Sequence, residues 1–333
     1  VSVCDCTEAL TRLPSRPAPR SVTVEPDPVT ARLANRAEGR SVSFMNHMRH
    51  PIRRHEQAGE LAVGLLAELS TFRQTGVAGA ALHGPGLFSY CALSRERLAA
   101  VRLDRPILGV VLCGAKEVWL GESFERLVPG MVFALPARTD LDIVNEVDSV
   151  TGVYQSLILE IAPEDVPDLA PLVSNVSSGT YYQVPLSAEL VEALLHAARA
   201  IAAGPPSDTI RRARIAELLA ILNGVPSAAA LFRLSVSERV ARILRGELDS
   251  PWTAARIAKK LSMSESTLRR RLAAEGNTFS DILRRERMAA ARKLIAAGAG
   301  SGQAALAVGY VSRAHFARAF RTTFGDNPID FRV

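Results

Sequence analysis

The chain of 333 residues lacks any apolar run near the about 18–20 residues that a membrane-spanning helix requires, which excludes an integral membrane protein of that kind. No apolar core follows its first basic residues, so we expect no secretory signal peptide. The cysteines show neither a disulfide framework nor a paired zinc spacing; they are Cys4, Cys6, Cys91 and Cys113. Together these absences predict a cytoplasmic protein.

Charge is present but unevenly distributed. The whole chain has 40 Lys+Arg and 34 Asp+Glu, a net charge of +6. Residues 235–333 hold 18 of the basic and 9 of the acidic residues, so this third carries +9 and the remainder −3. A basic domain on an acidic remainder indicates a polyanion-binding domain joined to a domain with another task.

The N-terminal segment is rich in Pro and Arg and lacks apolar periodicity. We expect residues 1–57 to form a disordered tail. The sequence begins with Val1, while Met45 and Met48 stand just before the first ordered-looking segment. We therefore hypothesise a translation start near Met45, which N-terminal sequencing of the native protein would test.

The next segment, residues 58–170, reads as a β-rich domain. Residues 58–71 have the spacing of a short amphipathic helix. Short apolar runs follow, separated by turn residues, and indicate an antiparallel sandwich or barrel able to enclose one small ligand. The runs are LFSYCAL (87–93), ILGVVLC (107–113), EVWLG (117–121), MVFALP (131–136) and YQSLILEI (154–161).

Two amphipathic helices are expected between the β-rich domain and the basic third. Residues 186–203 and 208–223 have apolar residues at helical spacing, and Gly204–Pro205–Pro206–Ser207 separates them. Their apolar faces must pack on the β domain, on each other or on a second copy of the chain. We therefore regard residues 185–233 as linker or dimerisation helices.

The basic third contains an internal repeat. Each copy reads as a helix, a tight turn and a second helix, over about 254–275 and 302–325. Leu268 and Leu272 of the first copy correspond to Phe316 and Phe320, each 48 residues later. This pattern is typical of two helix-turn-helix units, for which Ser264 and Ser312 would cap the second helices.

Polar and basic residues lie opposite these apolar anchors. An exposed basic helix face can enter the DNA major groove, where Arg binds guanine bidentately. We predict base contacts from Ser266, Arg269, Arg270, His315 and Arg318. We predict phosphate contacts from Arg271, Arg313 and Arg321.

The C-terminal part of about 100 residues resembles the DNA-binding domain of AraC/XylS-type transcription regulators. The likeness rests on GYVSRAHFARAFRTTFGDNPIDFR at 309–332 and on RRERMAAARKLIAAG in an expected long helix at about Phe279–Ala296. It implies a bacterial regulator that binds double-stranded operator DNA, with RNA polymerase as a further partner. The domain would be residues 235–333.

The N-terminal part is similar to the cupin-like regulatory domain of one AraC subgroup, through residues 107–139. The two resemblances imply an α+β chain: a cupin-like antiparallel β-barrel with flanking helices, then an all-α double helix-turn-helix domain. The first domain would bind a small-molecule effector or form a homodimer. Candidate effector anchors are Tyr90, Arg105, Trp119 and Arg138.

Two alternatives remain open. A cupin-type metal oxygenase or isomerase would need a set of His and carboxylate ligands on strands. The His residues before the basic third do not provide it; they are His47, His50, His55, His83 and His196. Since no nucleophile elbow, phosphate loop or dinucleotide fingerprint occurs either, we expect no enzyme, cofactor or metal site. The other alternative is a constitutive DNA-binding regulator without an effector.

Overall fold

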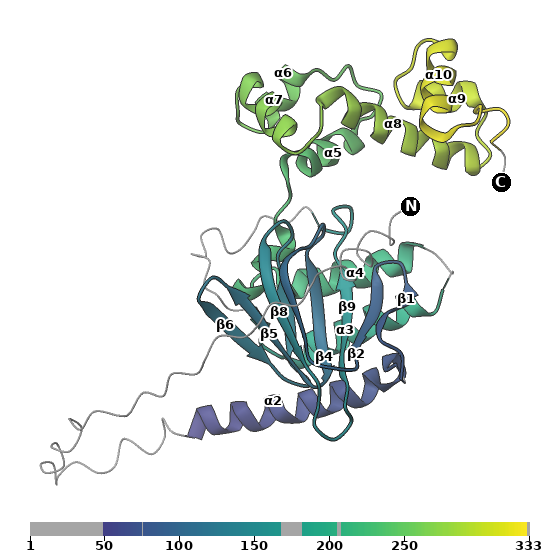
Figure 1. The fold of residues 1–333 in the computed structure, drawn as a ribbon. Helices are drawn as coiled ribbons and strands as arrows, with labels where there is room; N and C mark the ends of the chain where they lie inside the picture. The colour runs from purple at the N-terminus through teal and green to yellow at the C-terminus, as the bar shows by residue number, and fades with distance from the viewer. Residues whose placement is uncertain (1–48, 75, 168–181, 205–207, 332–333) are drawn as a thin grey trace, which may run out of the picture. The chain divides into compact units, whose positions relative to one another are not determined.

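The computed structural model describes residues 49–74, 76–167, 182–204 and 208–331 (Figure 1). They fall into two compact units, which meet in sequence between Phe232 and Arg233. The first combines antiparallel sheets with flanking helices, and the described part of the second is helical. The expected α+β class, with an all-α C-terminal domain, is confirmed.

The first unit is a sandwich of two antiparallel sheets in the described part of the chain. One sheet has the order β1 (Gly79–Gly84), β2 (Leu87–Ala92), β9 (Tyr154–Glu160), β4 (Ile107–Cys113), β7 (Val132–Leu135) and β10 (Gln183–Val184). The other has the order β3 (Glu96–Arg102), β8 (Asp140–Glu146), β5 (Ala115–Leu120) and β6 (Ser123–Leu127). No described strand pair joins the two sheets, so the expected barrel is an open sandwich.

Both sheets contribute to one apolar core. Alternate residues of each strand point inward, as the pleat requires, so that Val118 and Ile143 of one sheet meet Phe133 and Ile158 of the other. Gly109 of β4 is required here because a Cβ at this position would collide with the Phe133 ring. The core therefore holds the two sheets face to face.

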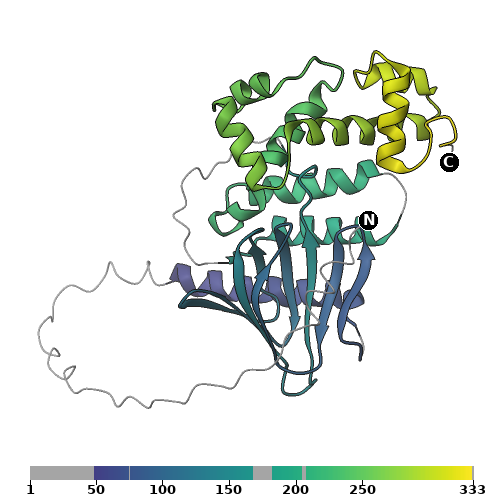
Figure 2. The same ribbon diagram turned by 45° about the horizontal axis from the view of Figure 1, so that its top comes forward.

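Helices cover the outer face of the larger sheet (Figure 2). α3 (Ala188–Ala202) packs on β1 and β2, and α4 (Asp208–Leu222) packs on α3. Leu194 and Ala198 of α3 contact an apolar surface that includes Leu87 and Leu157. The helices expected at 186–203 and 208–223 are confirmed. The short helix η2 (Pro226–Phe232) packs on β7.

The N-terminal helix corrects one expectation. α2 spans Arg49–Glu68 and is followed by η1 (Leu69–Phe72), so the disordered tail expected over residues 1–57 is wrong for residues 49–57. The polar run RHPIRRHEQ has too little apolar periodicity to reveal a helix. Pro51 does not interrupt it because it lies in the first turn, where a missing N–H is tolerated. Residues 1–48, with Met45 and the Cys4–Cys6 pair, lie outside the described residues.

The second unit contains the repeated helices. Its elements are α5 (Val236–Gly246), α6 (Ala254–Lys260), α7 (Glu265–Ala274), α8 (Phe279–Ala296), α9 (Ser301–Ala307) and α10 (Arg313–Phe324). α5, α6 and α7 surround one apolar cluster with the start of α8, while α9 and α10 surround a second cluster with the end of α8. The long helix expected at Phe279–Ala296 is confirmed. Across the described residues no helix has the length and apolar character needed to cross a membrane.

Candidate nucleic-acid interface

α7 begins at a cap and is held by two apolar anchors. The Ser264 hydroxyl accepts a hydrogen bond from the Thr267 backbone N–H at 3.2 Å, which confirms the expected N-cap. Leu268 and Leu272 are buried in the first apolar cluster, against Ile257 of α6 among others. Because the inward face of α7 is fixed by these anchors, its opposite face is presented to solvent.

The outward face of α7 carries the predicted contact residues. Ser266, Arg269, Arg270 and Arg271 are all exposed. Arg269 forms an ion pair with Glu265, one helical turn earlier, which aligns its side chain along the helix. No partner in the described part of the chain ion-pairs with Arg270 or hydrogen-bonds to it, so its guanidinium is available to a ligand.

α10 is built in the same way but with aromatic anchors. The Ser312 hydroxyl accepts a hydrogen bond from the His315 backbone N–H at 3.3 Å, so this predicted cap is also confirmed. Phe316 and Phe320 are buried, and the Phe320 ring lies 4.7 Å from that of Phe324 between ring centroids. The aromatic cluster fixes the inward face of α10.

The predicted residues of α10 are exposed as well: Arg313, His315, Arg318 and Arg321. The His315 ring packs edge-on against Tyr310 at 5.5 Å. The Arg321 Nε–H donates to the Asn327 side-chain oxygen at 2.8 Å, so Asn327 orients this guanidinium near the end of the helix. Both second helices thus present exposed basic residues: Arg318 lies opposite the Phe316 and Phe320 anchors, whereas Arg313 lies on the side of α10 that meets Gly302 of α9.

A groove of about 510 Å³ lies between α8 and α10. Its lining combines residues of both helices and of the turn before α10: Ser280, Leu283, Arg284, Arg287, Tyr310, His315, Arg318, Ala319 and Thr322. The sequence prediction named only His315 and Arg318 from this set. Ser280, Arg284 and Arg287 stand at i, i+4 and i+7 on one face of α8, which is the signal that could have identified them.

Comparisons with known proteins agree with this geometry. A family model described as a helix-turn-helix domain matches residues 257–333. The transcriptional regulator SirC of Salmonella typhimurium (strain SL1344) is 38% identical over 100 residues, which are 30% of this chain and 34% of SirC. The HTH-type transcriptional regulator YdeO of Shigella flexneri is 40% identical over 95 residues, or 28% of this chain and 38% of YdeO. Residues 257–333 therefore form a helix-turn-helix domain, and part of the chain is similar in sequence to two transcription regulators.

A solved structure is also similar to part of this chain. A DNA-binding transcriptional dual regulator from Escherichia coli K-12 is 32% identical over 30% of this chain and 90% of that chain, with a TM-score of 0.29. At that score the superposition adds nothing to the sequence identity. The chain spans about a third of the length of SirC and YdeO. The family model itself matches residues 257–333, in the second unit.

The four candidate effector anchors lie on different elements of the first unit, and a backbone hydrogen bond joins the loops of Arg105 and Arg138. Tyr90 of β2 packs against the core between the sheets, and burial raises the pKa of its hydroxyl. Trp119 stacks on Phe124 at 4.3 Å, on the face of its sheet opposite to Val118. Arg105 is exposed in the turn before β4, and the exposed Arg138 donates its backbone N–H to Leu103.

The interior of the sandwich contains a polar row that sequence reasoning missed. Lys116, Asn145 and Glu96 are cross-strand neighbours on β5, β8 and β3. The Lys116 ammonium donates to the Asn145 side-chain oxygen at 2.7 Å, and the Asn145 amide donates to Glu96 at 2.6 Å. The Lys116 ammonium also lies 5.0 Å from the centroid of the Tyr154 ring, in the facing sheet.

Lys116 is buried, and burial lowers its pKa to about 7. The Tyr154 and Ser156 hydroxyls are buried in the facing sheet, and neither makes a hydrogen bond of normal geometry with a described residue. Burying a cation and hydroxyls without full hydrogen bonding costs stability, so this polar row is a feature of the core that packing alone does not require. Within the described ranges, no three His, Cys, Asp or Glu side chains are grouped so that they could hold a metal ion.

Proposed function

We propose that the chain is a sequence-specific DNA-binding transcription regulator. The observation that carries the proposal is the repetition, in one AraC-type domain, of a capped helix with buried anchors and an exposed basic face. A charge run that merely keeps a helix in solution has no reason to recur in register with buried anchors. In this proposal α7 and α10 enter successive major-groove faces, about 34–36 Å apart along the DNA.

The predicted contact residues divide into two roles. Ser266, Arg269, Arg270, His315 and Arg318 face the groove floor and read base edges. Arg271, Arg313 and Arg321 bind phosphates and position the helices without reading sequence. Arg284, which ion-pairs with Asp281 at 2.7 Å, joins the second group because it lines the groove between α8 and α10. Phosphate contacts make the affinity fall with rising salt concentration.

The test is selection of binding sites from random-sequence DNA by the full chain, followed by affinity measurements on the enriched site. We expect an enriched two-part motif and a steep negative salt dependence. Arg270→Ala should relax one position of the motif, whereas Arg271→Ala on the same helix should weaken all sequences alike and serves as the matched control. Failure to enrich any sequence at low salt would overturn the proposal.

The remaining roles follow from this function. We propose that the chain is a regulator and not an enzyme, that it acts in the cytoplasm where bacterial DNA lies, and that it contacts RNA polymerase at promoters. α3 and α4, with the rest of residues 185–233, are proposed to join the two units and to support a homodimer. Measuring the mass of the protein in solution tests the dimer.

We also propose that the first unit binds a small-molecule effector, and that the polar row around Lys116 is where it acts. The support is the burial of Lys116, Tyr154 and Ser156 with hydrogen-bonding capacity left over. An effector alters DNA binding only if it prefers one of two states of the protein. Thermal-shift screening with small carboxylic acids and neutral polyols, repeated on Lys116→Met, tests the site: a shift that the variant retains places the ligand elsewhere.

The pH dependence of stability provides a separate check on Lys116. In the folded chain its pKa is about 7, against 10.5 for the free side chain. Between these values the unfolded chain binds more protons, so the stability of the first unit rises with pH across this window. Lys116→Met should flatten that rise in thermal unfolding, while the exposed Lys259→Met should leave it unchanged. A rise that persists in Lys116→Met would show that other groups cause it.

A further inference from the structure

Arg287 lies where α8 passes from one helix-turn-helix unit to the other. Ile282, earlier on α8, belongs to the first apolar cluster, and Met288 and Ala291 belong to the second. The side chain of Arg287 points into neither cluster. It reaches instead the loop between α5 and α6 and the turn between α9 and α10.

The guanidinium makes three contacts at this junction. Its Nε–H donates to the Leu248 carbonyl at 3.0 Å, and its Nη2 donates to the Ser250 carbonyl at 3.2 Å. The guanidinium carbon also lies 5.7 Å from the centroid of the Tyr310 ring. Leu248 and Ser250 lie in the loop that leads into the first helix-turn-helix unit, and Tyr310 lies in the turn of the second, so one side chain contacts both sides of the junction.

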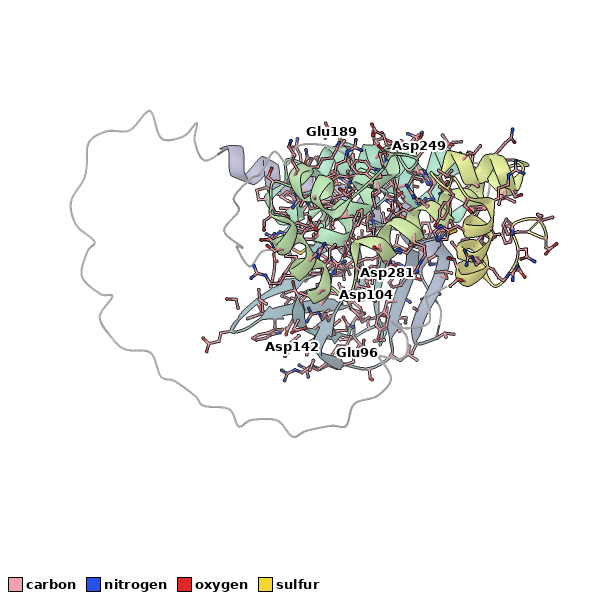
Figure 3. All side chains as sticks on the ribbon, turned by 90° about the horizontal axis from the view of Figure 1, so that it is seen from above. Glu96, Asp104, Asp142, Glu189, Asp249 and Asp281 are labelled. Carbon is pink, nitrogen blue, oxygen red and sulfur yellow. The ribbon has the colours of Figure 1, made fainter. Side chains whose placement is uncertain are left out.

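The two units approach closely at the same place. Gly309 has a φ of +77°, and a Cβ there would lie 2.9 Å from the Asp249 Cα and 2.7 Å from Nη2 of Arg287. Asp249 is labelled in Figure 3. The turn between α9 and α10 therefore packs directly on the loop between α5 and α6, and only a glycine fits at position 309.

The loop that receives Arg287 is itself held in place. The Trp252 indole donates to the Glu247 carbonyl at 2.6 Å, and the Arg256 guanidinium lies 4.6 Å from the centroid of the Trp252 ring. Since Trp252 is buried in the first cluster, the loop is anchored to the unit that positions α7. Tyr310 packs at 5.6 Å on Phe316, which anchors α10.

We propose that Arg287 is a positioning residue that fixes α7 relative to α10 and thereby sets the spacing between the two parts of the DNA site. The proposal rests on the DNA-binding function proposed above. Helix α8 alone fixes the separation along its own axis. The contacts of Arg287 lie off that axis, on the loop and on the turn, and so fix the orientation of one unit against the other.

The first arm of the test does not depend on DNA. Spin labels at Ala274 and Thr323, in full-length protein whose native cysteines are replaced by serine, report the distance between α7 and α10 by pulsed electron paramagnetic resonance. We expect one narrow distance distribution, broadened in Arg287→Ala and in Arg287→Lys, which keeps the charge but lacks the planar fork. An unchanged distribution in both variants would overturn the proposal.

The matched control is Arg292→Ala. Arg292 also lies on α8 and packs over aromatic rings, 5.3 Å from the centroid of Phe324 and 5.1 Å from that of Phe331. These rings belong to the second unit alone, so its loss should leave the distance distribution narrow. Tyr310→Leu, which keeps the two carbonyl contacts, should broaden the distribution less than Arg287→Ala and covers the case in which the latter unfolds.

The second arm is selection of random-sequence DNA with the same full-length variants. Arg287→Ala should enrich both halves of the wild-type motif but with a spread of spacings, and should bind the wild-type spacing roughly tenfold more weakly because a looser link lowers the effective concentration of the second half. A wild-type spacing in Arg287→Ala would contradict the proposal. Broadened distances with no DNA enriched by any form would support the junction and overturn the DNA-binding function.

Discussion

The two helix-turn-helix units reach one geometry by different means. The first turns at Ser262, a non-glycine residue with a φ of +55°, and buries aliphatic anchors, Leu268 and Leu272. The second turns at Gly309, with a φ of +77°, and buries Phe316 and Phe320 in an aromatic cluster. The first helix-turn-helix unit therefore has backbone strain in its turn, and the second helix-turn-helix unit has large rings in its apolar cluster.

This difference shows which features the repeat requires. A left-handed residue in the turn, a serine cap and two buried anchors one helical turn apart occur in both units. The identity of the anchors and of the turn residue varies. Gly309 is nevertheless not free to vary, because a Cβ there would collide with Asp249 of the loop before the first helix-turn-helix unit.

The largest loss of stability should follow the removal of an aromatic ring from the apolar cluster of the second helix-turn-helix unit. Phe320 is fully buried and contacts the rings of Phe316, Phe324 and Phe331. We expect Phe320→Ala to lower the free energy of unfolding of the second helix-turn-helix unit by about 3–5 kcal/mol. Hydrogen exchange resolved by peptide should show the loss in α9 and α10 first.

The matching change in the first helix-turn-helix unit is Leu272→Ala. We expect it to lower the free energy of unfolding by about 2–5 kcal/mol and to increase hydrogen exchange in α6 and α7. If each variant loosened both pairs of helices equally, the two clusters would form a single core. The comparison between two separately anchored units would then be wrong.

The turns should respond next. Gly309→Ala places a Cβ against Asp249 and forces alanine into the left-handed region, so we expect a loss of about 2–4 kcal/mol. Urea unfolding of the purified variant measures it. A loss of unfolding free energy below about 1 kcal/mol would mean that the turn between α9 and α10 does not pack on the loop between α5 and α6.

DNA reading gives a smaller effect that separates the helices. Arg270→Ala on α7 and Arg318→Ala on α10 should each cost about 1–3 kcal/mol of specific binding and relax different positions of the selected site. Affinity measurements on single-base variants of that site distinguish the two. If both substitutions relaxed the same position, the helices would not read separate halves.

The smallest predicted change is a gain. Ser262→Gly should raise stability by about 0.5–1 kcal/mol, because the relief of left-handed strain exceeds the added flexibility of glycine. A thermal melt of the variant measures it. No gain would show that the two turns do not differ in strain.

The repeat was predictable because its signals are local. The anchors and the caps follow from spacing within a short segment, and the helix at Phe279–Ala296 follows from the resemblance to AraC/XylS-type regulators. Arg287 could not be singled out in the run RRERM, since the carbonyls that it binds lie 39 and 37 residues away in sequence. A contact between distant loops leaves no pattern in either segment.

The β-rich unit before Arg233 also depends on contacts between distant segments, which local sequence patterns do not show. Strands such as β3 (ERLAAVR) and β8 (DLDIVNE) contain several charged residues and differ from the expected apolar runs, whereas the apolar β4 and β9 match them. The strand expected at 117–121 is β5, which begins at Ala115 and so includes Lys116; a lysine gives no local sign of a core position because lysine is rarely buried. Its burial follows from pairing with Asn145, 29 residues further on, which no local pattern predicts.

The central claim is that α7 and α10, the second helices of the two helix-turn-helix units, read DNA together. The most direct measurement is selection of random-sequence DNA by the full chain with footprinting of the enriched site. Our account predicts two protected major-groove segments on one face of the DNA, about one helical turn apart, with Arg270→Ala changing one segment and Arg318→Ala the other. Protection of a single segment, altered alike by both substitutions, would contradict it.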